Sequence, residues 1–443
     1  MTTRAAVILW GRQIGAVVWV PERRLGVFQY TPEFARSGIE VAPLRLPLQV
    51  LPREFPDLPF HTFHGLPGLL ADSLPDKFGN ALIDAWLARQ GRTPESFDPV
   101  ERLCYVGRRG MGALEFEPSI DRGGTNADAP LQIDALVELA SSVLRERETH
   151  GGRFGAAAED SGDAAALQDI LRVGTSAGGA RAKALVAWNP RTGEYRSGQL
   201  DAPEGFGHWL LKFDGVNANR DKELADPQGY GRIEYAFHLM ALAAGLQMTE
   251  CRLHEEGGRA HFMTRRFDRT EDGRRLHMQS LGALAHYDYN AAGAYAYEQA
   301  LQAMLRLRLD VSQLEQQVRR TLFNVVARNQ DDHVKNIAFL MGRRGRWRLA
   351  PAFDVTWAYN PDGDWTARHQ MTINGRRDGF TVDDLCAMGL VGHIKAGRTR
   401  RMLQEVCDVV ANWRDFAARA GVPDEDAARI KKSFRLDLGR PSA

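Results

Sequence analysis

The stretch "NVVARNQDDHVKNIAFLM", residues 324–341, places charged and amide side chains between an apolar helical run and an apolar run typical of a strand. Upstream, Leu314, Val318, Leu322 and Val325 recur at helical spacing, which predicts an amphipathic helix over residues 312–329. Downstream, "IAFLM", the basic turn "GRRGR" and "WRLA" predict a short hairpin. The polar loop between this helix and this hairpin is therefore the feature around which we expect the rest of the chain to be arranged.

Within this loop, Asp331 and Asn336 are separated by the interval found between the Asp and the Asn of a protein-kinase catalytic loop, HRDxxxxN. Such a loop presents a carboxylate to the incoming hydroxyl group and an amide oxygen to Mg²⁺. Asp354, in "AFDV", follows across the hairpin, where a kinase places its second metal-binding residue. The neighbouring Asp332 is one residue short of the kinase interval, so we expect it to be a loop or substrate-side residue.

A lysine strand and a glycine-rich stretch precede the loop. Lys212 ends the apolar strand "HWLLKF", and Glu234 lies 22 residues later on a predicted helix, as in kinases where a helix Glu orients the phosphate-binding Lys. A single Lys at such a place is more often a solvated strand end, and only the downstream loop favours the functional interpretation. The stretch "GTSAGGARAK", residues 174–183, offers backbone N–H groups to an anion. Its spacing fits a hairpin turn equally well, but its position before the lysine strand favours a phosphate cover.

Composition excludes several other classes of protein. The net charge of +1 gives no global field that would draw the chain to nucleic acid or anionic lipid, and we interpret the basic runs at 341–348 and 395–401 as solvated turns. The four cysteines lie far apart without a CxxC pair, which predicts core thiols. No apolar run reaches the length of a bilayer span, so we expect a cytoplasmic protein without a membrane partner. No HExxH motif of a zinc enzyme is present.

The pattern of elements predicts four consecutive units. Alternating strands within residues 5–50, the helix "DKFGNALIDAWLARQG" and the strand "GALEFEP" indicate an accessory α/β domain over residues 1–120. A helix and linker are expected at 121–163, a nucleotide-binding lobe at 164–270, and a mainly helical catalytic lobe at 271–443.

Together these motifs resemble those of the HipA family of bacterial toxin kinases, and the resemblance covers nearly the whole chain. "NQDDHVKN" resembles the family's D-x-H-x-K-N loop, "APAFDV" its metal-binding Asp segment, and "GTSAGGARAK" its S-x-x-G-x-x-x-K phosphate loop. "HWLLKF" and "TRRFDR" resemble its lysine strand and its hinge, and "LLADSLPDKFGN" with "GRRGMGALEF" resembles its amino-terminal accessory domain.

This resemblance implies an α+β fold with a protein-kinase-like two-lobed core, an N-terminal accessory α/β domain and a helical C-terminal lobe. It also implies an ATP- and Mg²⁺-dependent serine/threonine kinase that is the toxin of a toxin–antitoxin pair. The implied partners are a helix-turn-helix antitoxin and, through it, operator DNA. The implied protein substrate is an aminoacyl-tRNA synthetase.

The same resemblance assigns roles to residues at matching positions. Asp331 would be the catalytic base, Asn336 and Asp354 would hold Mg²⁺, and Lys212 would contact phosphate. Ser176 matches the family's autophosphorylation site, with Thr175 as the adjacent competitor. Arg265 departs from the acidic residue expected in the hinge, which leaves a backbone contact to the nucleotide. The other expected ATP-binding residues are Gly178, Gly179, Ala180, Arg181, Ala182, Lys183, Arg265, Arg266, Phe267, His333, Val334, Lys335 and Phe353.

Two alternatives belong to other functional classes. One is a small-molecule phosphotransferase of related fold, acting for example on a sugar or an aminoglycoside. The other is a kinase-fold corepressor that acts with its DNA-binding antitoxin. The intact set of Asp331, Asn336, Asp354 and Lys212 favours an enzyme over the corepressor. The accessory domain and the serine in the glycine-rich loop speak against the small-molecule enzyme, which needs neither.

Overall fold

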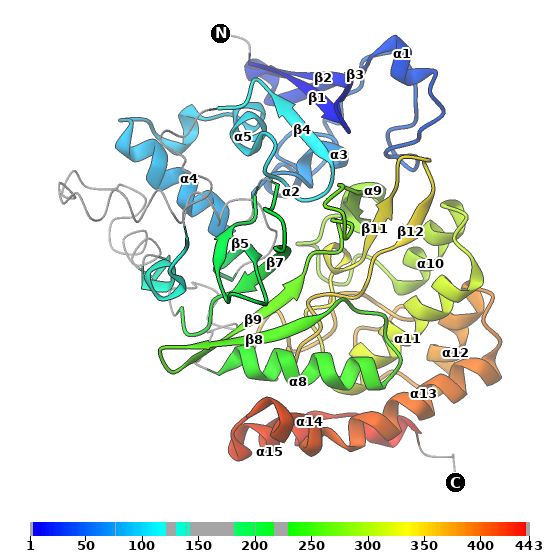
Figure 1. The fold of residues 1–443 in the computed structure, drawn as a ribbon. Helices are drawn as coiled ribbons and strands as arrows, with labels where there is room; N and C mark the ends of the chain where they lie inside the picture. Colours follow the sequence, from blue (N-terminus) through cyan, green and yellow to red (C-terminus); the bar gives the residue numbers. More distant parts are fainter. Residues whose placement is uncertain are drawn as a thin grey trace.

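The computed structural model describes residues 3–75, 77–120, 130–138, 140–141, 181–199, 201–216 and 229–439. The amino-terminal sheet and the carboxyl-terminal helices lie at opposite ends of the molecule, with a second sheet and its helix α8 between them (Figure 1). Ser176, Thr175, Gly178, Gly179 and Ala180 fall outside the described residues, so their predicted roles stay predictions.

The amino-terminal unit is built on an antiparallel sheet with strand order β3-β2-β1-β4. Its first three strands follow the predicted apolar alternation, and the strand from "GALEFEP" pairs with the other edge of β1. The strands are β1 (Arg4–Leu9), β2 (Arg12–Val20), β3 (Leu25–Tyr30) and β4 (Leu114–Glu117). The helices of this unit are α1 (Pro32–Ala35), α2 (Phe60–Phe63), α3 (Gly68–Ala71), α4 (Lys77–Arg89) and α5 (Pro99–Val106).

The middle unit is an antiparallel sheet with strand order β6-β5-β7-β9-β8 and one covering helix. Its elements are β5 (Lys183–Trp188), β6 (Tyr195–Ser197), β7 (Gly207–Lys212), α8 (Tyr230–Ala243), β8 (Cys251–Glu256) and β9 (Arg259–Arg265). Helix α8 approaches β9 closely at Gly231, where an added Cβ would lie 1.9 Å from the carbonyl oxygen of Ala260. Only glycine permits this distance, so Gly231 sets how near the first turn of α8 comes to the sheet.

The carboxyl-terminal part combines a small sheet of order β10-β11-β12 with a group of helices. Its strands are β10 (His277–Ser280), β11 (Ala338–Met341) and β12 (Trp347–Leu349). Its helices are α9 (Leu281–Ala285), α10 (Tyr297–Arg306), α11 (Val311–Ala327), α12 (Val382–Val391), α13 (Ala396–Ala411), α14 (Trp413–Ala420) and α15 (Asp424–Ser433). The polar loop thus connects α11 to β11, as its flanking periodicities predict.

Two hydrophobic clusters join the amino-terminal unit to the rest of the chain. In the larger one, Leu69 and Leu70 of α3 belong to the same continuous core as Leu281 and Leu284 of α9. In the second, apolar side chains of α4 pack with those of β5 and β7. Each buried leucine contributes about 1.5–3 kcal/mol. The accessory unit therefore contacts both the middle unit and the carboxyl-terminal part.

The cysteines and the helices agree with two expectations from composition. Cys104, Cys251, Cys386 and Cys407 are all buried and form no disulfide, which confirms the prediction of core thiols. Among the described residues, no helix combines the length and the apolar character that crossing a bilayer requires.

A fully buried ion-pair cluster fastens the accessory unit to the segment that follows β9. The Asp268 carboxylate is inaccessible to solvent and lies 2.7 Å from Arg266 Nη2 and 2.8 Å from Arg269 Nη1. It also accepts a hydrogen bond from the backbone N–H of Gly112, just before β4. Burial alone would raise the pKa of Asp268, but the two arginines outweigh it and hold that pKa well below its ordinary value.

Replacing Asp268 by alanine is expected to lower the free energy of unfolding by about 3–5 kcal/mol, because it leaves two buried guanidinium groups without their counter-ion. Denaturant titration of wild type and Asp268→Ala measures this loss. Asp272→Ala is the matched control, since the Asp272 side chain is 55% exposed beside Arg274, and it should change stability little. Equal stability of the two variants would contradict the fastening role.

Candidate functional site

The centre of the site is Lys212, the last residue of β7. Its ammonium nitrogen lies 2.5 Å from Glu234 Oε1 on α8 and 2.5 Å from Asp354 Oδ1, in the segment after β12. Only 10% of the Lys212 side chain and 1% of the Glu234 side chain are exposed, against 34% for Asp354. The structure therefore brings together three residues that the sequence singled out from separate parts of the chain.

The charged groups of Lys212 and Asp354 shift each other's pKa values, and the Glu234 carboxylate contributes to the shift of Lys212. Burial alone would lower the pKa of Lys212, but the carboxylates of Asp354 and Glu234 outweigh it and raise that pKa. Burial alone would raise the pKa of Asp354, but the positive charges of Lys212 and Lys183 lower it to about 2. Asp354 is therefore a carboxylate at neutral pH. Its backbone lies in the left-handed region, at φ +52°, which is costly for a residue other than glycine and is typical of functional positions.

Lys183 and Arg181 add two more cations beside Glu234 and Lys212. Lys183 begins β5 directly opposite Lys212 on β7, and its side chain is buried. Arg181 lies 3.6 Å from Glu234 Oε2, and its guanidinium stacks over the Tyr230 ring at 3.6 Å. Ala182 is buried between them, and its carbonyl oxygen accepts a hydrogen bond from the Phe213 N–H. This end of the sheet thus carries three cations against the carboxylates of Glu234 and Asp354, and the excess of positive charge suits a site for phosphate groups.

The polar loop begins where α11 ends. Arg328 adopts a left-handed conformation, at φ +58°, and its N–H bonds to the Asn324 carbonyl as a helix cap. Asp331 follows with 29% of its side chain exposed, and its Oδ1 accepts a hydrogen bond from Trp365 Nε1 at 2.7 Å. Burial and the neighbouring carboxylates Asp354 and Asp332 raise the pKa of Asp331, against the lowering effects of His333 and Trp365.

Asp332 differs sharply from Asp331, its neighbour in sequence. It is buried, and its carboxylate accepts hydrogen bonds of 2.7 Å each from the Tyr297 hydroxyl, His369 Nδ1 and the Gln370 N–H. Burial alone would raise the pKa of Asp332, but His369 and these hydrogen bonds outweigh it and lower the pKa. Of the two roles expected for Asp332, these contacts agree with that of a loop residue, because its buried carboxylate holds the polar loop in place and does not face a substrate.

The rest of the polar loop holds Asn336 close to Asp331 and places the side chains of His333, Val334 and Lys335 in different surroundings. Asn336 Nδ2 donates to the Asp331 carbonyl oxygen at 2.8 Å, which leaves its amide oxygen as a ligand candidate for a cation. The Lys335 ammonium lies 5.0 Å from the centre of the Tyr289 ring. The His333 ring lies beside that same ring, and His333 Nε2 is 3.8 Å from Asp331 Oδ1. Val334 is buried in the core and presents no side chain to a ligand.

In the predicted hinge, Arg265 and Arg266 make contacts within the protein, whereas Phe267 offers an apolar surface. The backbone N–H groups of Arg265 and Arg266 donate to the carbonyls of Glu250 and His208, and the Arg266 side chain pairs with buried Asp268. Phe267 lies beside Phe353, with ring centres 5.5 Å apart, next to Asp354. The apolar surface suited to a base is therefore offered by the two phenylalanines, and any contact to the hinge backbone must use groups other than these two N–H groups.

Several residues that shape the site had no local signal in the sequence. Trp365, Tyr297 and His369 reach Asp331 or Asp332 from distant parts of the chain. No spacing rule connects an indole or an imidazole so far away with a loop carboxylate. Only the fold shows that they belong together.

The donor set suits a hard cation and a nucleotide. Mg²⁺ prefers oxygen ligands and usually takes one or two from the protein, with phosphates and water completing its shell. The Asp354 carboxylate and the Asn336 amide oxygen are such ligands, and Lys212 and Lys183 stand beside Asp354. Among the described residues, no group of three or more His, Cys, Asp and Glu side chains could hold a metal ion.

Two protein-family models match the chain, and they follow one another in the expected order. The HipA N-terminal domain matches residues 5–117, and the HipA-like C-terminal domain matches residues 175–430. No curated protein matches the chain.

Two solved structures resemble this chain to different degrees. A chain of the Shewanella oneidensis MR-1 toxin–antitoxin complex of HipA, HipB and operator DNA has a TM-score of 0.64 at 16% identity, covering 98% of this chain and 96% of that one. The Helicobacter pylori proinflammatory kinase CtkA has a TM-score of 0.31 at 11% identity, covering 53% of this chain and 89% of that one. The first likeness confirms the expected fold: an α+β, kinase-like core with an accessory domain.

Asp332→Asn is expected to destabilise the protein by about 3 kcal/mol at pH 7, because the new amide group would face three buried donors. Asp331→Asn should not destabilise it, since burial disfavours the charged form of that carboxyl. Because the pKa of Asp332 is lowered in the folded protein, its carboxylate stabilises the fold at pH values above its ordinary pKa. This stabilisation is lost as the pH falls through the pKa of the folded state.

The stability difference between wild type and Asp332→Asn should therefore shrink in acid, as thermal unfolding at pH 7 and at acidic pH can measure. A less stable Asp331→Asn would show that the structural and exposed carboxylates have been exchanged.

Proposed function

The chain belongs to the HipA family, whose C-terminal domain matches more than half of it, and from this premise we propose that it is an ATP-dependent serine/threonine protein kinase. We further propose that it acts as the toxin of a toxin–antitoxin pair. The observation that carries the enzymatic proposal is Lys212, which bridges Glu234 and Asp354 beside the loop of Asp331. A protein that used this fold only for binding would have no need of a buried lysine between two carboxylates.

In the proposed reaction, Asp331 orients the substrate hydroxyl and accepts its proton. Trp365 donates to Oδ1, so it fixes the plane of the carboxylate and leaves Oδ2 to face the hydroxyl. The raised pKa of Asp331 increases its basicity, which makes proton transfer more favourable. Asn336 ties its amide nitrogen to the Asp331 backbone, so the base and the proposed metal ligand keep a fixed spacing.

The remaining residues would bind and orient the nucleotide. When bound, Mg·ATP supplies the phosphoryl group and a cation that neutralises its charge. Asn336 and Asp354 would hold the cation, and Lys212, Lys183 and Arg181 would contact phosphate oxygens. Gly178, Gly179, Ala180 and Ala182 would cover the phosphates, while Phe267 and Phe353 would hold the base beside the backbone of Arg265 and Arg266. His333 and Lys335, and Val334 through its backbone alone, would complete the side of the site that the polar loop forms.

The proposed partners are a helix-turn-helix antitoxin and, through it, operator DNA. The complex of the similar Shewanella chain contains HipB and operator DNA, which supports this proposal. An aminoacyl-tRNA synthetase as substrate, and a cytoplasmic location, rest on the resemblance of the motifs. We also propose the domain division 1–120, 164–270 and 271–443, with 121–163 as helix and linker. The accessory unit shares its core with both lobes, which a small-molecule phosphotransferase does not need.

We propose that the enzyme also phosphorylates its own Ser176. Phosphate would add about −1.5 to −2 charges to a glycine-rich loop whose proposed task is to enclose the phosphates of ATP. Like-charge repulsion would then disfavour the closed loop and inhibit the enzyme.

Asp331→Asn should abolish phosphoryl transfer, lowering its rate by a factor of about 10² to 10⁴, and should leave nucleotide affinity almost unchanged. Asp354→Asn should weaken the binding of Mg·ATP itself, because a proposed cation ligand is lost. Calorimetric titration of both variants with Mg·ATP, together with a transfer assay, separates the two roles. Equal losses of nucleotide affinity would refute this division.

Incubation with Mg·ATP should place phosphate within residues 174–183 of the wild type and none there in Asp331→Asn. Mass spectrometry of the digested protein locates the group and distinguishes Ser176 from Thr175. A Ser176→Ala variant controls for phosphate on the neighbouring hydroxyl. A phosphorylated wild type that binds ATP as tightly as the unmodified protein would refute autoinhibition.

A further inference from the structure

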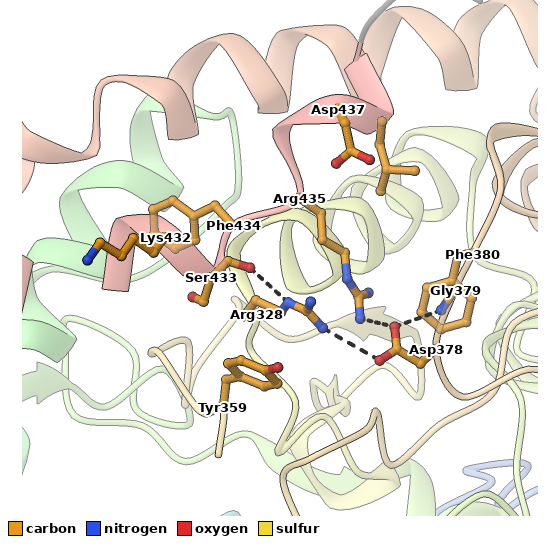
Figure 2. A pocket seen from close by; sticks show the side chains of 11 residues that line it. Arg328, Tyr359, Asp378, Gly379, Phe380, Lys432, Ser433, Phe434, Arg435 and Asp437 are labelled. Atoms are coloured by element: carbon orange, nitrogen blue, oxygen red, sulfur yellow. Dashed lines mark hydrogen bonds and ion pairs between the residues drawn. The ribbon is translucent and has the colours of Figure 1, made fainter. Parts of the chain in front are cut away.

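A cavity of about 460 Å³ lies behind the polar loop, between the end of α11, residues 378–380 and the segment that follows α15 (Figure 2). Its volume is within the range of small-molecule sites, roughly 300–1,000 Å³. None of the residues to which we assign nucleotide or metal binding lines it. It is lined by Arg328, Tyr359, Asp378, Gly379, Phe380, Lys432, Ser433, Phe434, Arg435, Asp437 and Leu438.

Two arginines in this cavity share a single carboxylate. Arg328 Nη1 lies 3.6 Å from Asp378 Oδ2, and Arg435 Nη2 donates to Asp378 Oδ1, so both guanidinium groups converge on one side chain (Figure 2). The arginine side chains are only 17% and 11% exposed, whereas Asp378 is 38% exposed. In this group one negative charge thus faces two largely buried positive charges, and the other two charged residues of the lining, Lys432 and Asp437, are of opposite sign. Burial and the nearby Arg328 lower the pKa of Arg435 to about 10, in line with an excess of positive charge.

Both guanidinium groups are held in position by neighbours other than Asp378. Arg328 Nε donates to the Ser433 carbonyl oxygen at 2.9 Å, and its guanidinium stacks over the Tyr359 ring at 4.4 Å. The Arg435 guanidinium lies 5.6 Å from the centre of the Phe380 ring. Fixed guanidinium forks match the oxygens of carboxylates and phosphates and lose little entropy on binding them. The cavity therefore has the chemistry of an oxyanion site.

The cavity is connected to the polar loop by hydrogen bonds. Arg435 Nη1 lies 3.3 Å from His369 Nε2, and His369 Nδ1 lies 2.7 Å from the Asp332 carboxylate. Since the carboxylate can only accept, Nδ1 carries the hydrogen and Nε2 accepts from Arg435. Arg328 is itself the cap of the helix that delivers the loop. A ligand that takes a hydrogen bond from either arginine would therefore also affect the contacts next to Asp331.

We propose that this cavity binds a small anion carrying a phosphate or carboxylate group, and that its occupancy is transmitted to the polar loop through Arg435, His369 and Asp332. The bound oxyanion takes hydrogen bonds from Arg328 and Arg435 in competition with Asp378. The proposal needs no kinase activity, because it concerns binding and the loop's stability alone.

Calorimetric titration with inorganic pyrophosphate and, separately, with citrate tests the site and distinguishes phosphate from carboxylate. Arg435→Gln should weaken binding about tenfold or more, since a charge-assisted hydrogen bond is lost. Asp378→Asn should tighten binding several-fold, because it removes the competing carboxylate. Arg429→Gln is the charge-matched control: this exposed arginine of α15 pairs with Asp426 and does not line the cavity, so affinity should not change.

Arg435→Gln should weaken binding and Asp378→Asn should tighten it. If Arg435→Gln fails to fold, the tighter binding expected for Asp378→Asn still tests the site. Pyrophosphate bound at the Lys212 site instead would be insensitive to both substitutions. That result, or the absence of binding by both probes at millimolar concentration, would overturn the proposal.

Hydrogen exchange of the backbone amides in residues 329–337 tests the connection to the loop. A saturating probe should slow their exchange several-fold in the wild type, because a bound anion holds Arg435 and hence His369 in place. The same addition should have no effect in Arg435→Gln. Unchanged exchange in a saturated wild type would overturn the proposed transmission.

Discussion

The structure depends on one ammonium group, that of Lys212, held between Glu234 and Asp354. Removing the Lys212 ammonium group and the Glu234 carboxylate from water costs several kcal/mol per ion, which only close geometry and further partners offset. Here the central strand β7, helix α8 and the segment after β12 each contribute one of the three charges. Because these elements come from both lobes, the ion-pair group fixes how the two lobes meet. It also places a cluster of positive charge, with Lys183 and Arg181, where a polyphosphate would have to lie.

The adjacent carboxylates of the opening sequence have different tasks. Asp332 is saturated by hydrogen bonds and holds the loop to the helical part, which leaves Asp331 partly exposed and oriented by Trp365. Their pKa values shift in opposite directions. Hydrogen bonding and His369 lower the pKa of Asp332, whereas burial raises the pKa of Asp331. The polar loop therefore contains one buried carboxylate that holds it in place and one partly exposed carboxylate that is free to face a substrate. An ordinary turn would supply neither. The buried carboxylate also gives the cavity behind the loop a direct connection to the site.

Local periodicity was enough to predict the elements that carry the site. The helical spacing of Leu314 to Val325 predicted α11, the apolar run before Lys212 predicted β7, and the hairpin after the loop was found as β11 and β12. The intervals between Asp331, Asn336 and Asp354, and between Lys212 and Glu234, indicated which side chains should meet. Contacts made by Trp365, His369 and Tyr297, the Arg266–Asp268–Arg269 cluster and the arginine-lined cavity could not be predicted. They join segments far apart in the chain, and neither spacing nor composition encodes such pairings. The roles of Ser176 and of the glycines before Arg181 remain predictions.

The central claim is that Lys212 organises a nucleotide site, and calorimetric titration of Lys212→Met with Mg·ATP tests it most directly. Lys395→Met, at an exposed position before α13, is the control for the loss of one positive charge. Lys212→Met is expected to bind Mg·ATP at least tenfold more weakly than wild type, and Lys395→Met is expected to bind it equally well. A folded Lys212→Met with wild-type affinity for Mg·ATP would show that Lys212 does not organise a nucleotide site.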